Sequence, residues 1–297
     1  MTTSQIGFVG LGIMGKPMAK NLIDSGYSLT VFDINQKAVD ELVTYGCIKA
    51  NSGKEVSESS KYIITMVPDS ADSEKAILGD NGVLEGTSKD KTIIDMSSIA
   101  PGMSQKIAKM CEANNVNFLD APVSGGEPKA IDGSLAIMVG GKENIFTRCK
   151  PIFEVLGSSV VLCGDYGAGN TTKLANQIIV AANIEAVSEA LVLAKKAGLD
   201  PNTVFNAIKG GLAGSTVLDA KAPMMIAGDF NPGFRIKLHQ KDLHNALLTG
   251  KDLGVPLPVT SLIQQMIGSL MNKGKGELDH SAIANFLEDL AQINIKE

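Results

Sequence analysis

The chain lacks the residue patterns that identify several classes of protein. Its 297 residues contain four scattered cysteines with no C-x-x-C pair, and three histidines with no H-E-x-x-H motif. We therefore expect reduced core thiols and no metal site. The formal net charge is −5, and no run of lysine or arginine indicates a surface for nucleic acid.

Apolar segments of the kind that target or anchor a protein are also missing from the sequence. A strand-like apolar pattern begins at Ile6, which leaves no room for a signal peptide. No uninterrupted apolar run reaches the roughly 18 residues that a membrane span requires. These absences predict a cytoplasmic protein with no membrane or nucleic-acid partner.

Glycine, in contrast, is abundant, and three glycines near the N-terminus form a motif. Gly10, Gly12 and Gly15 make G-x-G-x-x-G between a strand pattern at 6–9 and a helical pattern that ends near Gly26. A nucleotide pyrophosphate requires close approach of the backbone and N–H groups at a helix N-terminus, which side chains at these glycines would block. An ordinary tight turn is the alternative for the glycines alone. The predicted cofactor loop also includes Leu11, Ile13 and Met14.

An acidic residue stands where a dinucleotide site requires one. A second strand pattern at 28–32 ends at Asp33, 23 residues after Gly10. Its carboxylate can accept hydrogen bonds from the ribose hydroxyls of the adenosine half. No arginine follows Asp33 directly, which favours NAD, with NADP as the alternative cofactor.

The pattern of the chain changes at about residue 163. Strand and helix patterns alternate before this point, which predicts a Rossmann-type α/β domain with a doubly wound parallel sheet over 1–163. One long helix is expected at 171–197, because no strand pattern or proline interrupts it. We expect this interdomain helix to open an all-helical domain over 164–297. The further helices are predicted at 201–209, 237–253, 258–273 and 281–292.

The long helix has apolar residues on more than one face. Such a helix is expected to be buried nearly all round. A partner subunit would cover it more easily than one small helical domain, so we expect a homodimer or a homotetramer.

The segment Asp120 to Gly126, with the sequence DAPVSGG, follows a predicted strand. In open α/β sheets, ligands bind beyond the carboxyl ends of the strands. Ser124 and the amides of Gly125 and Gly126 would offer several donors to a substrate carboxylate. A tight turn in which proline and glycine have their usual roles is the alternative.

A second segment, GAGNTTKLANQ at 167–177, opens the long helix. Lys173, Asn176 and Gln177 share one helix face because they are spaced i, i+3 and i+4. A cation is disfavoured near a helix N-terminus, which favours loss of a proton from the lysine ammonium group. A solvated surface lysine is the alternative for an arbitrary helix.

The glycine loop, DAPVSGG and G-x-G-x-x-x-K, in this order and over nearly the whole chain, resemble the β-hydroxyacid dehydrogenase family. The stretches 121–133, 167–177 and 210–223 are most similar to the branch that reduces tartronate semialdehyde. The resemblance implies that Lys173 is the general acid in a reduction by NADH. It also implies that the substrate is held by Ser124, Gly125 and Gly126, together with Asn176 or Gln177. The family pattern has asparagine four residues after the lysine, where this chain has glutamine.

The resemblance also implies further cofactor-binding residues. In the segment 232–243, Lys241 matches a family lysine that reaches the cofactor, and Phe234 lies near it. Residues that follow two predicted strands would meet the nicotinamide half, namely Met66, Val67, Pro68 and Ser98.

Two kinds of alternative function stay open at this point. A 3-hydroxyisobutyrate dehydrogenase or a succinic semialdehyde or glyoxylate reductase would share every motif. An NAD-binding sensor without turnover would share the glycine loop, but it would not need a proton donor such as Lys173.

Overall fold

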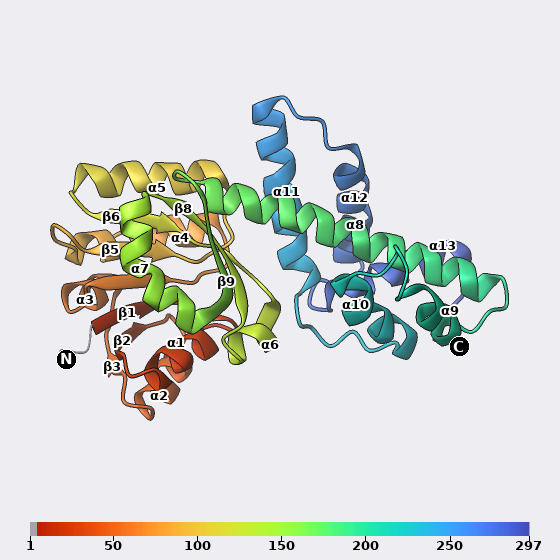
Figure 1. The fold of residues 1–297 in the computed structure, drawn as a ribbon, viewed down its shortest axis with the longest axis horizontal. Helices are drawn as coiled ribbons and strands as arrows, with labels where there is room; N and C mark the ends of the chain where they lie inside the picture. The colour runs from red at the N-terminus through yellow and green to blue at the C-terminus, as the bar shows by residue number, and fades with distance from the viewer. Residues whose placement is uncertain (1–4, 297) are drawn as a thin grey trace. The chain divides into compact units, whose positions relative to one another are not determined.

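The computed structural model describes residues 5–296, which form two compact units. The first unit ends at Lys173 and the second begins at Leu174, so the units divide within the long helix α8 (Ala168–Lys196). The boundary expected from the sequence, between 163 and 164, lies at the end of the last strand of the first unit (Figure 1).

The first unit is built on one sheet, which has nine strands within the described residues. The strand order β3-β2-β1-β4-β5-β6 is that of a Rossmann fold, and these six strands are parallel. The order reverses between β1 and β4, which creates a switch point where ligands bind in such sheets. The strands are β1 (Gln5–Val9), β2 (Ser28–Phe32), β3 (Ile48–Lys49), β4 (Tyr62–Thr65), β5 (Thr92–Asp95) and β6 (Asn117–Asp120).

The far edge of the sheet is mixed rather than purely parallel. The strands there are β7 (Val123–Ser124), β8 (Leu135–Gly141) and β9 (Gly157–Gly164). Strand β8 runs antiparallel to β6 and to β7, and β9 is parallel to β8. The periodicity of a strand in the sequence does not reveal its direction, so the expected parallel sheet missed this edge.

Helices cover both faces of the sheet (Figure 1). Neighbouring residues of one strand belong to different cores, because successive side chains of a strand point to opposite faces. The helices of this unit are α1 (Gly15–Asp24), α2 (Gln36–Val43), α3 (Gly53–Glu58), α4 (Ser70–Leu78), the 3-10 helix η1 (Val83–Gly86), α5 (Pro101–Ala113), α6 (Gly126–Ile131) and α7 (Glu143–Leu156). Ile64 packs in one core with α1 and α7, for example, whereas Ile63 packs in the other core with α3 to α5.

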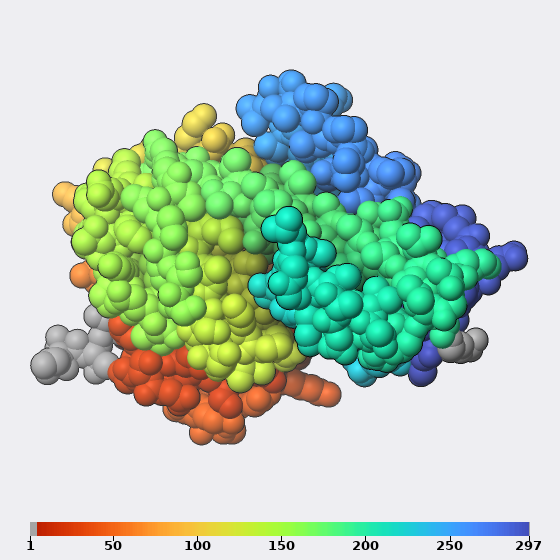
Figure 2. Space-filling model, turned by 45° about the vertical axis from the view of Figure 1, so that its right-hand side comes forward, coloured from red at the N-terminus to blue at the C-terminus, as the bar shows by residue number. Residues whose placement is uncertain are grey.

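The described part of the second unit is helical, as the sequence predicted. Its helices after α8 are α9 (Pro201–Ile208), α10 (Thr216–Ala227), α11 (Ile236–Leu253), α12 (Pro258–Asn272), the 3-10 helix η2 (His280–Ile283) and α13 (Ala284–Ala291). Figure 2 shows the segment of α9 and α10, in teal, at the surface.

Helix α10 was not predicted, because Pro223 lies inside it. A proline removes a backbone hydrogen bond from a helix. The helix forms nevertheless, since Ser215 caps its first turn and one face of the helix is buried in the core. The buried residues of this face are Leu218, Ala222 and Met225.

Helix α8 is less completely covered than the sequence suggested. Ile179 is 61% exposed and Leu193 is 72% exposed in the single chain. By length and composition, α8 is also the one helix among residues 5–296 that could cross a membrane. That match is weak evidence, because the core helix of a soluble protein passes the same test.

Candidate functional site

The glycine loop lies at the switch point of the sheet, between β1 and α1. Gly10 has a φ of +96°, and a Cβ atom there would lie 2.2 Å from the carbonyl oxygen of Met66. A Cβ on Gly15 would lie 1.9 Å from the carbonyl oxygen of Gly10. Both glycines are therefore required by the packing of the backbone itself.

Gly12 differs from its two neighbours in the motif. A Cβ atom on Gly12 would meet no atom within 4 Å, so the space above it is open. In addition, no side chain caps the start of α1 within the described residues. Open space next to an uncapped helix N-terminus is what a dinucleotide pyrophosphate requires, so the loop fits this group. Leu11 is buried and Ile13 is partly exposed in the same loop.

Asp33 lies directly beside this loop. One oxygen of its carboxylate accepts the N–H of Leu11 at 2.5 Å, and the other accepts the N–H of Asn35 at 2.6 Å. A carboxylate has about four acceptor positions, so capacity for ribose hydroxyls is left. The hydrogen bond to Leu11 fixes the acid relative to the glycine loop.

Residues 66–68 follow β4, beside the glycine loop. The N–H of Met66 donates to the carbonyl oxygen of Val9 at the end of β1. The N–H of Val67 donates to the hydroxyl of Ser97 at 2.9 Å, and this bond joins the loop to the residue before Ser98. The structure therefore brings Met66, Val67, Pro68 and Ser98 to the carboxyl ends of neighbouring strands.

A buried acid that the sequence interpretation missed supports these two loops. Asp95 ends β5 and accepts hydrogen bonds from the hydroxyl of Thr65 and from the N–H of Ser97. Burial raises the pKa of Asp95, against the hydrogen bonds from Ser97 and Thr65 that lower it. Its position at the end of the strand pattern TIID was the available signal.

A second acid, Asp120, holds the start of α8 at the end of β6. Its two oxygens accept the N–H groups of Gly167 and Asn170, each at 2.8 Å. The side chain of Asn170 in turn accepts the N–H of Ile99 and donates to Ser104. Burial raises the pKa of Asp120 to about 6, although the two N–H donors lower it.

These hydrogen bonds join the start of α8, which carries the predicted general acid Lys173, to the segment 120–126, which is predicted to bind the substrate carboxylate and is called the carboxylate loop below. Lys173 lies on the second turn of α8 and is only 5% exposed. Ser124 follows Asp120 by four residues and lies in β7. Lys173 and Ser124 are thus both tied to the end of β6 within the first unit.

The carboxylate loop itself has an irregular backbone. Gly125 and Gly126 have φ values of +142° and +70°, a region that favours glycine. Carbon atoms of the Lys129 side chain lie against Gly125, at 2.7 Å from the position of an added Cβ. The sequence analysis did not identify Lys129 as a neighbour of this loop. Its position four residues after Gly125, about one helical turn, was the signal that could have indicated the contact.

The remaining predicted residues belong to the second unit. The side chain of Asn176 donates to the side-chain oxygen of Gln177 at 2.9 Å. The side-chain nitrogen of Gln177 donates to Asp242 at 2.6 Å, and Lys241 forms an ion pair with the same carboxylate at 3.0 Å. Phe234 lies at the turn before α11, where its N–H donates to Asp279.

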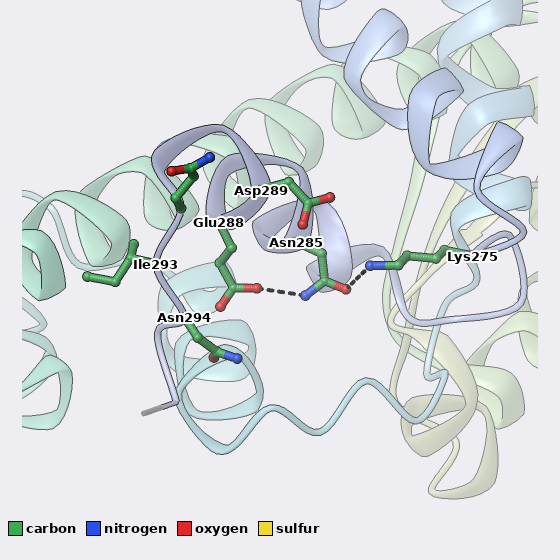
Figure 3. Close-up of a pocket in the computed structure, with 7 residues that line it drawn as sticks. Lys275, Asn285, Glu288, Asp289, Ile293 and Asn294 are labelled. Atoms are coloured by element: carbon green, nitrogen blue, oxygen red, sulfur yellow. Dashed lines mark hydrogen bonds between the residues drawn. The ribbon is translucent and has the colours of Figure 1, made fainter.

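A polar hollow at the end of the second unit contains none of these residues (Figure 3). Its polar groups bond to one another, since Asn285 accepts from Lys275 and donates to Glu288. We therefore do not regard this hollow as the candidate site. Within residues 5–296, no group of three His, Cys, Asp or Glu side chains is arranged to hold a metal ion.

Comparisons with known proteins identify the family to which both units are similar. The family model described as the NAD binding domain of 6-phosphogluconate dehydrogenase matches residues 5–164. The model described as NAD-binding of NADP-dependent 3-hydroxyisobutyrate dehydrogenase matches residues 167–287.

Individual relatives match over nearly their whole length. A 2-hydroxy-3-oxopropionate reductase of Escherichia coli is 48% identical over 97% of this chain and 98% of the relative. A 2-(hydroxymethyl)glutarate dehydrogenase of Eubacterium barkeri is 36% identical over 98% of this chain and 97% of the relative. The solved structure of Mycobacterium tuberculosis 3-hydroxyisobutyrate dehydrogenase with L-serine has a TM-score of 0.89 and 30% identity, covering 96% of this chain and 99% of that one. The chain thus belongs to the β-hydroxyacid dehydrogenase family and is an NAD(P)-dependent oxidoreductase that acts on CH–OH groups.

Proposed function

We propose that the chain reduces tartronate semialdehyde (2-hydroxy-3-oxopropionate) to D-glycerate, with NADH as the hydride source and Lys173 as the general acid. The observation that carries the proposal is the pair of hydrogen bonds by which Asp120 holds the start of α8. Through them, both the buried Lys173 and the loop with Ser124 are connected to the end of β6. The 48% identity to the relative named 2-hydroxy-3-oxopropionate reductase supports this substrate.

The proposed chemistry requires one hydride and one proton. NADH, when bound, supplies the hydride that reduces the aldehyde carbon. Lys173 donates a proton from Nζ to the carbonyl oxygen, so that no free alkoxide forms, and regains a proton from solvent afterwards. Ser124 and the amides of Gly125 and Gly126 hold the substrate carboxylate, and a side-chain amide of α8 orients the hydroxyl end.

We further propose which residues hold the cofactor. Asp33 would bind the adenosine ribose and prefer NADH, because its carboxylate repels the 2′-phosphate of NADPH. The open space at Gly12 supports the placement of the pyrophosphate there. The nicotinamide half would meet Met66, Val67, Pro68 and Ser98. For Phe234 and Lys241, a cofactor-binding role is proposed on the family resemblance alone.

We also propose that the protein is a homo-oligomer, a dimer or a tetramer. Large apolar side chains on two helices of the second unit are exposed in the single chain, which supports burial by another copy. These side chains are Ile179 and Leu193 of α8 and Leu290 of α13. Light scattering coupled to size-exclusion chromatography would give the subunit number directly.

A substrate panel tests the proposed reaction. The panel contains tartronate semialdehyde, methylmalonate semialdehyde, succinic semialdehyde and glyoxylate, each with NADH and compared by kcat/KM. We expect the highest value for tartronate semialdehyde. A higher value for methylmalonate semialdehyde would instead indicate a 3-hydroxyisobutyrate dehydrogenase, and NADH binding without turnover would indicate a sensor.

A further inference from the structure

The amide group of Gln177 is bonded at both ends inside the protein. Its nitrogen donates to the carboxylate of Asp242 at 2.6 Å, and its oxygen accepts from Asn176 at 2.9 Å. The side chain is 4% exposed. A hydrogen bond to a carboxylate is about twice as strong as one between neutral groups. Gln177 would have to give up this bond in order to turn toward a substrate.

The main chain of Gln177 is held by the same helix, α11. The Nε2 atom of His239 lies 3.3 Å from the carbonyl oxygen of Gln177. A carbonyl oxygen only accepts, so Nε2 of His239 carries the proton of this bond. His239 and Asp242 are three residues apart and share a face of α11, so this face holds Gln177 by both its backbone and its side chain.

The histidine is fixed by a second one. The Nδ1 atoms of His239 and His280 lie 2.9 Å apart. In a neutral His239 with its proton on Nε2, Nδ1 is the acceptor and Nδ1 of His280 donates. The hydrogen bonds therefore run in one direction, from His280 through His239 to the carbonyl oxygen of Gln177. The ring of Phe234 meets both imidazoles edge-on, with centroid distances of 5.7 and 5.3 Å.

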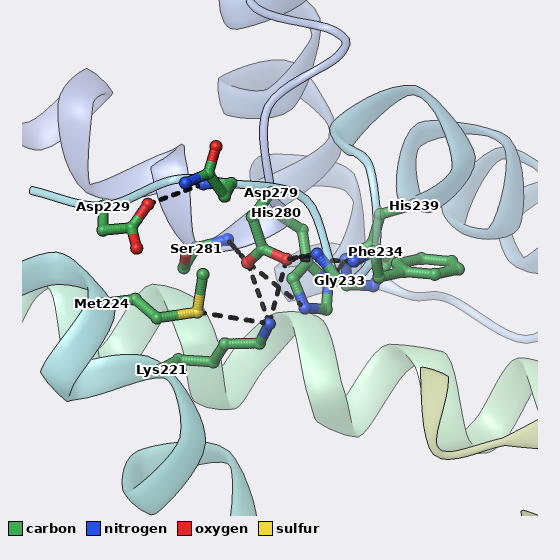
Figure 4. Close-up of polar contacts among 10 residues, drawn as sticks. Lys221, Met224, Asp229, Gly233, Phe234, His239, Asp279, His280 and Ser281 are labelled. Carbon is green, nitrogen blue, oxygen red and sulfur yellow. Dashed lines mark hydrogen bonds and ion pairs between the residues drawn. The ribbon is translucent and has the colours of Figure 1, made fainter. Parts of the chain in front are cut away.

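His280 begins η2 beside a fully buried acid, Asp279 (Figure 4). The carboxylate of Asp279 accepts from Lys221 and from the N–H groups of Gly233 and Phe234. Burial would raise the pKa of Asp279, but the charges of His280 and Lys221 hold it well below its usual range. Figure 4 shows the ammonium group of Lys221 and these backbone N–H groups converging on the one carboxylate. Nε2 of His280 lies 4.0 Å from this carboxylate, so an anion held by Lys221 and by the turn at 233–234 lies next to the first histidine of the chain of hydrogen bonds.

We propose that Gln177 is a positioning residue, held by Asp242 and His239, and that Asn176 is the amide that contacts the substrate. This inference rests on the proposed function, in which an amide of α8 orients the hydroxyl end of the acid. Asn176 is partly exposed and uses one N–H for Gln177, which leaves its second N–H and its oxygen for the substrate. It also lies three residues after Lys173, on the same face of α8. Gln177 thereby sets the rotamer of Asn176.

A reciprocal exchange of amide and acid tests the contact between Gln177 and Asp242. Gln177→Glu alone places two carboxylates against each other, and we expect it to raise KM for the semialdehyde at least about tenfold. Asp242→Asn alone can keep an acceptor toward Gln177 and should have a smaller effect. In the double variant, the glutamate accepts from Asn176 and from the new amide, so KM should return to within about threefold of native. Gln265→Glu, on the exposed surface of α12, is the matched control for an added charge.

The exchange also distinguishes a positioning role of Gln177 from direct binding of the substrate by Gln177. If Gln177 itself bound the substrate, the glutamate would still repel the substrate carboxylate in the double variant. A double variant that is no better than Gln177→Glu therefore overturns the proposal. NADH affinity, measured by fluorescence, should stay within about twofold of native in Gln177→Glu and in the Gln265→Glu control, because neither change removes the ion pair between Lys241 and Asp242.

A double-mutant cycle tests whether Gln177 acts through Asn176. Gln177→Ala should raise KM in the native background and change it by less than about twofold in the Asn176→Ala background. Losses that multiply would show that Gln177 contacts the substrate. Equal losses of kcat, of substrate affinity and of NADH affinity in both backgrounds would show a merely structural role. Either result overturns the proposal.

The affinity of the NADH-bound enzyme for D-glycerate provides a second readout that needs no turnover. If the native protein binds D-glycerate but does not reduce the semialdehyde, the proposed reaction fails, and the same cycle is read from D-glycerate affinity. If another member of the panel is the best substrate, the cycle is read with that compound. If the native protein neither turns over nor binds these acids, both proposals are wrong.

Discussion

The glycine loop and the start of α8 are two helix N-termini in the same unit, each following a strand, and they are built differently. At α1 no side chain caps the first turn, and the space at Gly12 is open. At α8 a protein carboxylate, Asp120, already accepts the N–H groups of Gly167 and Asn170. The first helix start can therefore receive a negatively charged ligand, whereas the second has its own anion.

This difference explains how the second helix can carry a cation. The positive end of a helix dipole disfavours an ammonium group in the first turns. The negative charge of Asp120 offsets that field one turn before Lys173. The two helix starts thus differ in the roles that we propose for them: the first would hold the pyrophosphate of the cofactor, and the second would carry the lysine that donates a proton.

The largest expected effect comes from removing the lysine. Lys173→Ala should lower kcat by roughly 10²–10⁴, because a positioned acid contributes about this much to a proton transfer. NADH affinity should stay near native, since the glycine loop is untouched. Arginine should rescue poorly, because it keeps the charge but does not readily release a proton. Turnover and NADH fluorescence are measured on the same folded variant. Reduction within a fewfold of the native rate would remove Lys173 from the mechanism.

The next effect concerns the acid that supports this helix. Burial raises the pKa of Asp120 to about 6, above the roughly 3.9 of an unfolded aspartate. The folded state therefore holds the proton more tightly, so the contribution of Asp120 to stability is full below about pH 4 and is lost as the pH rises through 6. The expected loss is about 3 kcal/mol, from a difference of two pKa units.

Asp120→Asn provides the comparison, because asparagine does not titrate. The free energy of unfolding is measured by urea denaturation at several pH values between 4 and 7. The value for the native protein minus that for the variant should fall across this range. A difference that rises with pH would mean that the two N–H donors outweigh burial, and the assigned direction of the shift would be wrong.

The matching test at the other helix start is Gly12→Ala. A methyl group there meets no protein atom, so the melting temperature should not change, but it would occupy the space expected for the pyrophosphate. We expect the Kd for NADH to rise at least about tenfold, or roughly 1.4 kcal/mol. Gly15→Ala is the contrast, because its Cβ meets the carbonyl oxygen of Gly10 and should destabilise the fold itself. Native NADH affinity in Gly12→Ala would place the cofactor elsewhere.

The same contrast shows what the sequence could and could not predict. The glycine loop could be predicted, because the backbone of this loop requires glycine at fixed positions in the sequence. The alternation of strands and helices could also be predicted, because each buried strand appears in the sequence as an apolar run. Helix α10 was missed, since local sequence shows Pro223 but not the core that the helix packs against.

The supporting side chains were equally hidden in the sequence. Asp95 and Asp120 were visible as acids at the ends of strand patterns, but their partners come from other parts of the chain. The hydrogen bond that Gln177 donates to Asp242 and the one that it accepts from His239 join residues more than 60 positions apart. No local spacing encodes such contacts, so the sequence left the roles of Asn176 and Gln177 open.

The smallest expected effect concerns the choice of cofactor at the glycine loop. Asp33 holds the N–H of Leu11 and would also bind the ribose, and its charge would repel a 2′-phosphate that carries nearly two negative charges. The native protein should therefore have a higher kcat/KM with NADH than with NADPH. Asp33→Ser should lower this ratio by about tenfold, because serine keeps a hydroxyl but removes the charge. A native kcat/KM with NADPH that equals or exceeds the value with NADH would show that Asp33 does not select the cofactor.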